Sequence, residues 1–511
     1  MVYYIPKNQV KIEDFELPMP GRMNPDNRWV SYAKMIPWEE LGAIYVSSMN
    51  QRKGRKGIHP RLAIGALLVK HLLNTSDEDT LRAMEENVYI QYFLGFNGFD
   101  KDRVFDSSLM VHIRKRVGAK GFARFNDLLI ERALEVKSKV KRSQKKASSK
   151  QEKQEEDNDS DSPGNETTHQ GVLKLDATVA DQKVRFPTDT SLLNECREKS
   201  EELIDALYHT IDGFEKPRTY RRVARKDYVS FSKKRRKTKK EIRKQTRKQL
   251  QYLRRNLGNI DQILDRVEGG SFPLEHYYQK MLWILHTVYE QQNEKYQTRV
   301  NSIPNRIVSA QQPYVRPIVR GKAKHNVEFG SKVNISEVDG LSRADFIRWE
   351  AYNEAQDLPA MVENYREMYG YYPEYVVVDK IYMNRANRKW MKENGIKTVG
   401  PALGRPKKIP KTEEELAFKK ALLRSRNHVE AKIGQGKSKY GLNQIRGKSM
   451  DSSEGMIHTI FFCMNLVRLL KVSWAQTLIT KNNYINSVKS IWRGIQEFNY
   501  FRFRFHQVEF Q

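Results

Sequence analysis

The spacing of apolar residues predicts helices in the first part of the chain. Apolar positions recur at helical intervals in the stretch after Pro60 (RLAIGALLVKHLL), and helix-start signals follow at Ser76 and at 106–108. Several short helices joined by short connections are typical of a helix-turn-helix-like bundle. The pattern therefore predicts an all-α N-terminal domain over residues 1–136.

A change of composition follows this region. Residues 137–170 begin basic (KSKVKRSQKK), turn acidic (EKQEEDNDSDSP) and offer little apolar surface. Such a segment gains too little from burial to offset the entropy of ordering it. We therefore expect a disordered linker.

Strand patterns begin after residue 170. Alternation over 172–175 predicts a strand that ends near Asp176, and the apolar run Tyr375–Val378 predicts a second strand, followed directly by Asp379. Further strand patterns follow Tyr314, a helical stretch covers about 190–312, and a long helix begins near Glu413. This order predicts an α/β domain over 171–470, with a mixed sheet flanked by helices, a helical insertion and a C-terminal tail at 471–511.

The charge balance indicates a polyanionic partner. The chain has 91 Lys and Arg against 62 Asp and Glu, a net charge of +29. Lys216 to Arg255 alone contains 19 Lys or Arg and two acids, with aromatic residues interleaved. Because like charges at this density repel one another, we interpret the segment, including Arg235 and Arg236, as a DNA-binding face. A solvated helix surface is the alternative.

A second basic cluster lies in the N-terminal domain. Arg114, Lys115 and Arg116 follow one another on its third predicted helix. They suit contact with DNA phosphates, and a solvated helix face explains them equally well.

Two observations bear on the compartment. Only two cysteines occur, which is too few for a disulfide framework and fits a reducing cytoplasm. The N-terminus has no signal-peptide pattern, and no apolar run approaches 18 residues, so we expect no membrane partner. The most apolar late stretch, Met456–Leu470, contains polar residues and is interpreted as a buried helix.

Three acids suit phosphodiester chemistry. Metal-dependent cleavage of DNA commonly uses two divalent ions about 3.5–4 Å apart, held by carboxylates from different elements. Asp176 and Asp379 are associated with predicted strands and Glu430 with a helix. A capping or turn aspartate is the alternative for Asp379, and by itself Glu430 is one acid in a charged helix.

Four stretches resemble the DDE transposases of bacterial insertion sequences. They are KLDATVADQKVRFPTDTSLLNECREK, RPIVRGKAKHNVEFGSKVNIS, VVVDKIYMNRANRKWMKENGI and RSRNHVEAKIGQGKSKYGL. The last fits the family signature in which Arg, Glu and Lys are separated by three and then six residues, here Arg426, Glu430 and Lys437. Relatives often carry a tyrosine three residues before that arginine, where this chain has Leu423, which puts a tyrosine contact in doubt.

The resemblance implies an RNase H-like catalytic core preceded by a DNA-binding domain. It makes Asp176, Asp379 and Glu430 the catalytic acids and the ligands of two Mg²⁺ ions, with Mn²⁺ as a substitute. Arg426 holds a phosphate beside the metal site, and Lys437 contacts the next one. Within the second stretch, Glu328 and Lys332 either position DNA or support the first acid, or they form a strand-edge salt bridge, which we favour.

The implied function is DNA transposition in the bacterial cytoplasm, at the nucleoid. The partners are double-stranded DNA, as terminal inverted repeats and target, and further copies of the chain in a homodimer or higher multimer. Two alternatives stay open. One is a catalytically inactive DNA-binding descendant of a transposase, and the other is an RNase H-like nuclease that cuts without joining.

Overall fold

The protein divides into two compact units. The structure is a computed structural model that describes residues 10–49, 57–100, 102, 104–148, 169–209, 215–267, 272–319, 327–350, 352–401 and 412–473. Unit 1 comprises Met1–Thr168, Glu337–Arg343 and His458–Gln511, and unit 2 comprises His169–Ser336 and Ala344–Ile457. The domain over 171–470 that the sequence predicts stays a prediction, and unit 2 lies within this range apart from His169 and Gln170.

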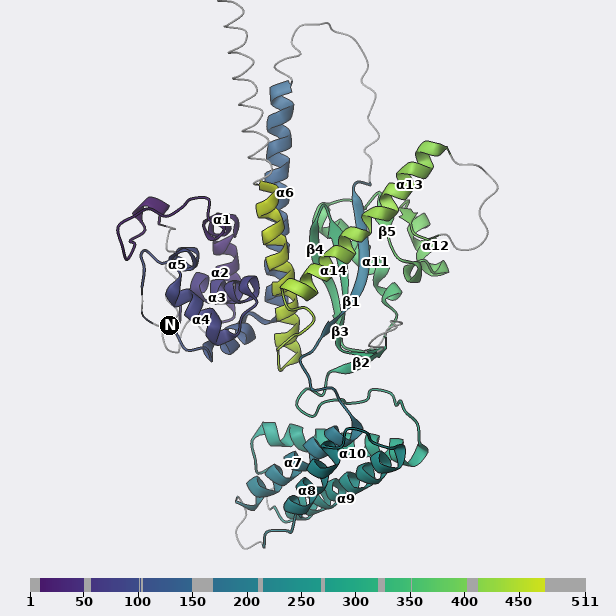
Figure 1. The fold of residues 1–511 in the computed structure, drawn as a ribbon. Coiled ribbons are helices and arrows are strands. Elements are labelled where there is room, and N and C mark those ends of the chain that lie inside the picture. Colours follow the sequence, from purple (N-terminus) through teal and green to yellow (C-terminus); the bar gives the residue numbers. More distant parts are fainter. Residues whose placement is uncertain are drawn as a thin grey trace, which may run out of the picture. The chain divides into compact units, whose positions relative to one another are not determined.

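Unit 1 is largely helical, as the apolar spacing predicts. Its elements are η1 (Ile12–Asp14), α1 (Arg28–Met35), α2 (Trp38–Ser47), α3 (Pro60–Leu73), α4 (Asp77–Glu86), α5 (Val88–Leu94) and α6 (Leu109–Ser148) (Figure 1). The start signals act as expected: the Ser76 hydroxyl accepts a hydrogen bond from the Asp79 amide at 3.1 Å. Arg61, although charged, is buried and donates to the carbonyl of Phe93 at 2.9 Å, where α5 ends.

Helix α6 overturns part of the linker prediction. It changes direction at Gly118, whose φ of 64° belongs to the left-handed region, and then continues to Ser148. Residues 137–148 are therefore helical. They contain no Gly or Pro, and adding residues to an existing helix is far easier than nucleating a new one. The rest of the predicted linker, 149–168, lies outside the described residues.

A buried polar cluster explains why Glu337–Arg343 belongs to unit 1. The Asn465 side chain donates to the Ser342 carbonyl at 2.7 Å and to Asn126 Oδ1 at 2.9 Å. Its own oxygen accepts from the Ser342 amide at 2.8 Å. All three residues are fully or almost fully buried. Hydrogen bonds of this kind are costly to leave unmade, so they fix the turn between two strands against α6.

The helix Met450–Ser473 has the predicted buried character. It is the one helix among the described residues that is long and apolar enough to cross a membrane by length and composition, and 67% of its apolar window is buried inside the protein. Burial of this kind is expected of a core helix. Of the tail predicted at 471–511, residues 474–511, including the aromatic and basic end YFRFRFHQVEF, lie outside the described residues.

A mixed sheet forms the centre of unit 2. The strand order is β2-β3-β1-β5-β6, with β4 also paired to β3. β1 pairs with β5 and β5 with β6 in parallel, whereas β2 and β3 are antiparallel. The strands are β1 (Val172–Asp181), β2 (Arg316–Val319), β3 (Val327–Val338), β4 (Leu341–Arg348), β5 (Tyr375–Val377) and β6 (Lys397–Val399).

Helices flank this sheet. They are η2 (Glu354–Asp357), α11 (Leu358–Tyr369), η3 (Lys380–Tyr382), α12 (Arg385–Glu393), α13 (Glu413–Ser425) and α14 (Asn427–Lys439). α13 and α14 follow one another across the sheet, with α14 against β1 and α13 against β6 (Figure 1). The prediction of a mixed sheet with flanking helices is thus confirmed.

The predicted helical insertion lies between β1 and β2. It contains α7 (Asp189–Tyr208), α8 (Arg221–Ser232), α9 (Lys239–Leu264) and α10 (His276–Thr298). α7, α9 and α10 share one apolar core that includes Leu203, Leu253 and Leu285. The insertion therefore has its own hydrophobic core, and the basic side chains of α8 and α9 remain outside it.

Candidate active site and basic surfaces

Asp176 lies within β1, and Asp379 comes two residues after the end of β5, the parallel neighbour of β1. The β1–β5 register pairs Val172 with Tyr375 and Lys174 with Val377, and the same spacing continued past the end of β5 would align Asp176 with Asp379. β1 continues to Asp181, so Asp176 lies within the strand and not near its end as the alternation had predicted. Asp379 follows β5 and accepts a hydrogen bond from the Lys380 amide at 2.7 Å.

Burial dominates the electrostatics of Asp176. Its side chain is 19% exposed, and this desolvation raises the pKa of the carboxyl above its ordinary value. The Ala177 amide and the Arg426 guanidinium lower that pKa, while the charges of Glu430 and Asp379 raise it. Glu430 and Asp379 are thus both close enough to Asp176 to act on its carboxyl.

Arg426 bridges two of these acids. It lies at the junction of α13 and α14, and its guanidinium is 2.5 Å from Glu430 Oε1 and 3.5 Å from Asp176 Oδ2. The four-residue spacing of Arg426 and Glu430 places both on one helix face, which contacts β1 through α14. Glu430 is 48% exposed and so remains open to solvent.

The donor set is compatible with a hard divalent cation. All three side chains are carboxylates, which Mg²⁺ prefers, and they come from three different elements. Within the described ranges, no three His, Cys, Asp or Glu side chains are close enough together to hold a metal ion as they stand. The Arg426 guanidinium lies between Asp176 and Glu430, so both of its ion pairs would have to break before one metal ion could contact these two carboxylates.

Lys437 lies within α14 and not beyond the helix. Its ammonium is 3.7 Å from Glu328 Oε1 on β3. Lys332 instead pairs with Glu354 of η2 and donates to the Tyr352 carbonyl. Glu328 and Lys332 therefore do not form a salt bridge with one another, and each ties its strand to a different neighbouring element.

Some residues that shape this site gave only weak sequence signals. A Cβ on Gly330 would lie 1.9 Å from the Ala180 carbonyl oxygen, so only glycine lets β3 approach β1 this closely. Gln182, just past β1, donates to Ser453 Oγ at 2.6 Å and to the Gly447 carbonyl at 2.8 Å. Of these two positions, only Gly330, within a predicted strand, offered a sequence signal for its role. Gln182 offered none, because its partners Gly447 and Ser453 lie far along the chain.

Tyr382 was not identified from sequence either. Its side chain is buried beside η2, and the hydroxyl has no hydrogen-bond partner among the described residues. Burial, together with the nearby charges of Glu354 and Asp176, raises the pKa of this hydroxyl well above 10. A tyrosine three residues after an aspartate carries no sequence signal for this position.

The N-terminal basic cluster divides into one structural and two exposed residues. Arg114 is 6% exposed and forms a bidentate ion pair with Asp77. Its Nη2 lies 2.7 Å from Oδ2 and its Nη1 lies 3.0 Å from Oδ1. The guanidinium is therefore already used inside unit 1, and its role as a phosphate contact stays a prediction without structural support. Lys115 and Arg116 are exposed on α6.

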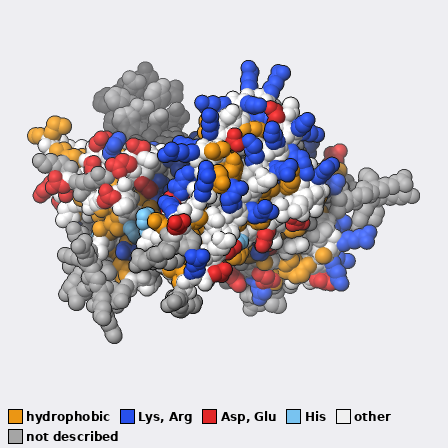
Figure 2. Space-filling view, turned by 90° about the horizontal axis from the view of Figure 1, so that it is seen from below, with side chains coloured by type: hydrophobic (Ala, Val, Ile, Leu, Met, Phe, Trp, Pro, Cys, Tyr) orange, Lys and Arg blue, Asp and Glu red, His pale blue; other side chains and the backbone are white. Residues whose placement is uncertain are grey.

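The basic stretch of the insertion lies on its surface. Of the Lys and Arg between Lys216 and Arg255, all except Arg221 and Lys248 are exposed, including Arg235 and Arg236 in the α8–α9 turn. Figure 2 views the molecule from the side on which Figure 1 draws the insertion, and Lys and Arg gather over much of this face. Few acids offset them: Lys234 pairs with Glu241 at 2.6 Å.

Comparison with known proteins identifies two domains. Residues 20–116 match a family described as a transposase domain (DUF772), and residues 376–467 match a transposase DDE domain. The second match includes Asp379, Arg426, Glu430 and Lys437, whereas Asp176 lies outside both. The resemblance to bacterial insertion-sequence DDE transposases is thereby confirmed.

One curated relative is similar over part of its length. It is described as an uncharacterized protein, ORF8 in the nfe locus of Rhizobium meliloti, and is 33% identical over 117 residues. The match covers 22% of this chain and 54% of the relative, so it spans about half of that protein. No solved structure matches the chain.

Proposed function

We propose that this chain, a transposase by its two matched domains, is the enzyme of a bacterial insertion sequence that cuts the ends of its element and joins them to target DNA. The observation that carries this proposal is that Asp176 on β1 and Asp379, just after the neighbouring parallel strand β5, continue one strand register, while Arg426 links Asp176 to Glu430. A core of RNase H-like fold accompanies it, because the DDE domain implies that fold.

Asp176, Asp379 and Glu430 would hold the metal ions, with Mg²⁺ as the expected ion and Mn²⁺ as a substitute. Two bound ions would activate the attacking oxygen and stabilise the leaving oxygen of an in-line displacement at phosphorus. Each carboxylate contributes a different property: Asp176 is largely buried, Asp379 accepts a hydrogen bond from an amide, and Glu430 is half-exposed to solvent.

Arg426 can pair either with the two carboxylates or with a DNA phosphate. With the site as described, its guanidinium neutralises Asp176 and Glu430. A DNA phosphate offers the same guanidinium a bidentate partner, which frees both carboxylates to bind metal. Lys437, already held near Glu328 on β3, would contact a neighbouring phosphate.

The basic surfaces support DNA binding outside the catalytic centre. Lys115 and Arg116 on α6, and Arg235 and Arg236 on the insertion, are exposed and suit phosphates of the terminal inverted repeats or the target. The resemblance to insertion-sequence transposases implies that the working form would be a dimer or higher multimer that pairs the two ends. Such a protein would act in the cytoplasm, on the nucleoid.

The test is an assay with the terminal inverted repeats of the chain's own element, target DNA and Mg²⁺. We expect cleaved ends and joined products from the wild type, and neither from Glu430→Gln. Binding without cleavage would instead identify an inactive DNA-binding descendant. Cleavage without joined products would identify a nuclease.

A further inference from the structure

Two adjoining hollows lie on the helical insertion, away from the three acids. One has a volume of about 460 Å³ and includes Lys237 and Arg306 in its lining. The other has a volume of about 530 Å³ and includes Lys240 and Arg299. Asp189, Ile242, Lys295 and Asn301 line both, so the hollows form one continuous track.

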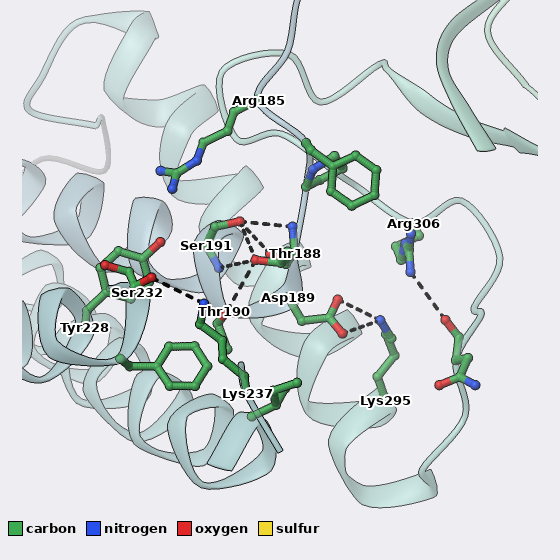
Figure 3. A pocket seen from close by; sticks show the side chains of 15 residues that line it. Arg185, Thr188, Asp189, Thr190, Ser191, Tyr228, Ser232, Lys237, Lys295 and Arg306 are labelled. Atoms are coloured by element: carbon green, nitrogen blue, oxygen red, sulfur yellow. Dashed lines mark hydrogen bonds and ion pairs between the residues drawn. The ribbon is translucent and has the colours of Figure 1, made fainter. Parts of the chain in front are cut away.

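The only acid lining this track is already neutralised. Asp189 receives the Lys295 ammonium at 2.7 Å on each carboxylate oxygen, and Lys295 is buried (Figure 3). The Asp189–Lys295 ion pair, which lines both hollows, therefore carries no net charge. The remaining charges of the lining are all positive.

Apart from Lys295, three cations of the track have no acidic partner in the part of the chain that the structure describes. Among the described residues, no carboxylate lies within ion-pair distance of Lys240, Arg299 or Arg306. Arg306 donates only to the Asn301 carbonyl at 3.3 Å, and Lys237 donates to the Lys234 carbonyl at 2.8 Å. Carbonyl groups do not neutralise charge. Because these like charges line the same two hollows, they repel one another, and a polyanion would relieve that repulsion.

Two helix starts add to this positive potential. α7 begins at Asp189, directly after the capping residue Thr188, and α9 begins at Lys239, after the capping residue Thr238. The N-terminus of a helix carries a partial positive charge. Figure 3 shows Thr188 and Ser191 at the start of α7, facing Lys237 and Ser232 across the first hollow.

We propose that this track binds the sugar-phosphate backbone of DNA, with one phosphate in each hollow. A small anion would fill only one hollow, whereas a polyanion extends through both and onto the exposed Lys and Arg of α8 and α9. This inference rests on the proposed function for the choice of DNA as the ligand. It adds a second DNA-binding site, away from the catalytic acids, that contacts the sugar-phosphate backbone.

The experiment measures DNA affinity as a function of salt concentration, without divalent metal, so it is independent of catalysis. The track variant is Lys240→Gln/Arg306→Gln, with one residue from each hollow. The matched control is Lys280→Gln/Arg388→Gln, which removes the same charge from exposed positions on α10 and α12, outside the basic segment Lys216–Arg255.

The track variant should lose about 0.9 in the slope of log K against log salt per contact with duplex DNA, or about 0.7 with a single strand. For two contacts this corresponds to about a 10- to 30-fold weaker affinity at 0.15 M salt. The single variants should each lose about half of the slope change, and the control should match the wild type. The titration is run with duplex and with single-stranded DNA. The form whose affinity falls more in the track variant is the form that the track holds.

Three results would overturn the proposal. They are equal losses in the track variant and the control, no loss in either, and unchanged DNA binding alongside weakened binding of polyglutamate. The last would indicate an acidic protein partner. Thermal unfolding of each variant distinguishes a lost contact from a lost fold. A failed cleavage assay with normal track binding would count against the proposed function and not against this site.

Discussion

Asp379 is aligned with Asp176 across the parallel pair of β1 and β5, two residues beyond the last paired positions. Neighbouring parallel strands with matched register present equivalent residues on the same face. Two acids that are 203 positions apart in sequence thus become neighbours. The hydrogen-bonded register, and not proximity along the chain, creates this pair.

Replacing either aspartate should abolish cleavage and joining while leaving DNA binding intact. Asp176→Asn and Asp379→Asn each remove one charge from the metal-binding set. Because a bound metal contributes several kcal/mol to transition-state stabilisation, we expect a loss on the order of 10³-fold in rate. Rates from a cleavage assay in Mg²⁺ and Mn²⁺ measure this, with Asp345→Asn as a control elsewhere on the sheet. Normal rates for both variants would remove these residues from the site.

Arg426→Gln should reduce the cleavage rate about 10- to 100-fold, as expected for the loss of one charge-assisted hydrogen bond to phosphate. The same change should shift the acid limb of the pH–rate profile to higher pH. Arg426 lowers the pKa of Asp176, so its removal raises that pKa and more base is needed to ionise the carboxyl. Arg426→Lys keeps the charge but loses the bridge, and we expect an intermediate profile. An unchanged acid limb in Arg426→Gln would contradict the assigned contact.

Arg114 and Lys115 should differ sharply although they are adjacent. Arg114→Gln removes the bidentate partner of Asp77, which keeps its ion pair with Lys70, so we expect a loss of about 1.5–3 kcal/mol in the free energy of unfolding. Lys115→Gln should change that free energy by less than about 0.5 kcal/mol and weaken DNA binding instead. Denaturant unfolding and a binding titration separate the two effects. Equal stability of the two variants would show that the Asp77 pair is unimportant.

Gly330→Ala should disrupt the sheet next to Asp176. The added methyl group would meet the Ala180 carbonyl at 1.9 Å, so β1 and β3 must separate, and we expect a loss of more than about 3 kcal/mol. Gly258→Ala is the control, because no atom lies within 4 Å of its added Cβ in α9. That helical substitution should stabilise the protein by about 0.5–1 kcal/mol. Thermal unfolding of the two variants gives the comparison, and similar melting temperatures would be inconsistent with the close approach of the strands.

His71 should make unit 1 sensitive to acid. Burial, with help from Lys70 and Arg114, lowers its pKa from 6.5 to about 3. The unfolded chain therefore binds a proton that the folded chain excludes, so stability is complete above pH 6.5 and falls as pH drops toward 3. His71→Gln should remove about 3 kcal/mol of this dependence between pH 7 and pH 4. Denaturant unfolding at both pH values measures it, with the exposed His112→Gln as the control, and identical slopes in wild type and His71→Gln would refute it.

Local patterns were sufficient to predict much of the fold. The alternation around Asp176, the apolar run before Asp379 and the cap at Ser76 each depend on residues within a few positions, and the structure has the corresponding elements. Charge counting predicted a basic insertion, and its cations are exposed. Such predictions succeed because periodicity and capping are properties of neighbouring residues.

The sequence by itself determined the elements, the basic surface and the candidate acids. Only the tertiary structure decided which charges were available. Arg114 and Lys115 look alike in sequence, but Asp77, 37 positions from Arg114, binds the first and leaves the second exposed. Likewise, Arg426 became a bridge between two acids only when α14 packed on β1. The physical reason is that burial and Coulomb interactions depend on distance in space, which local sequence patterns do not encode.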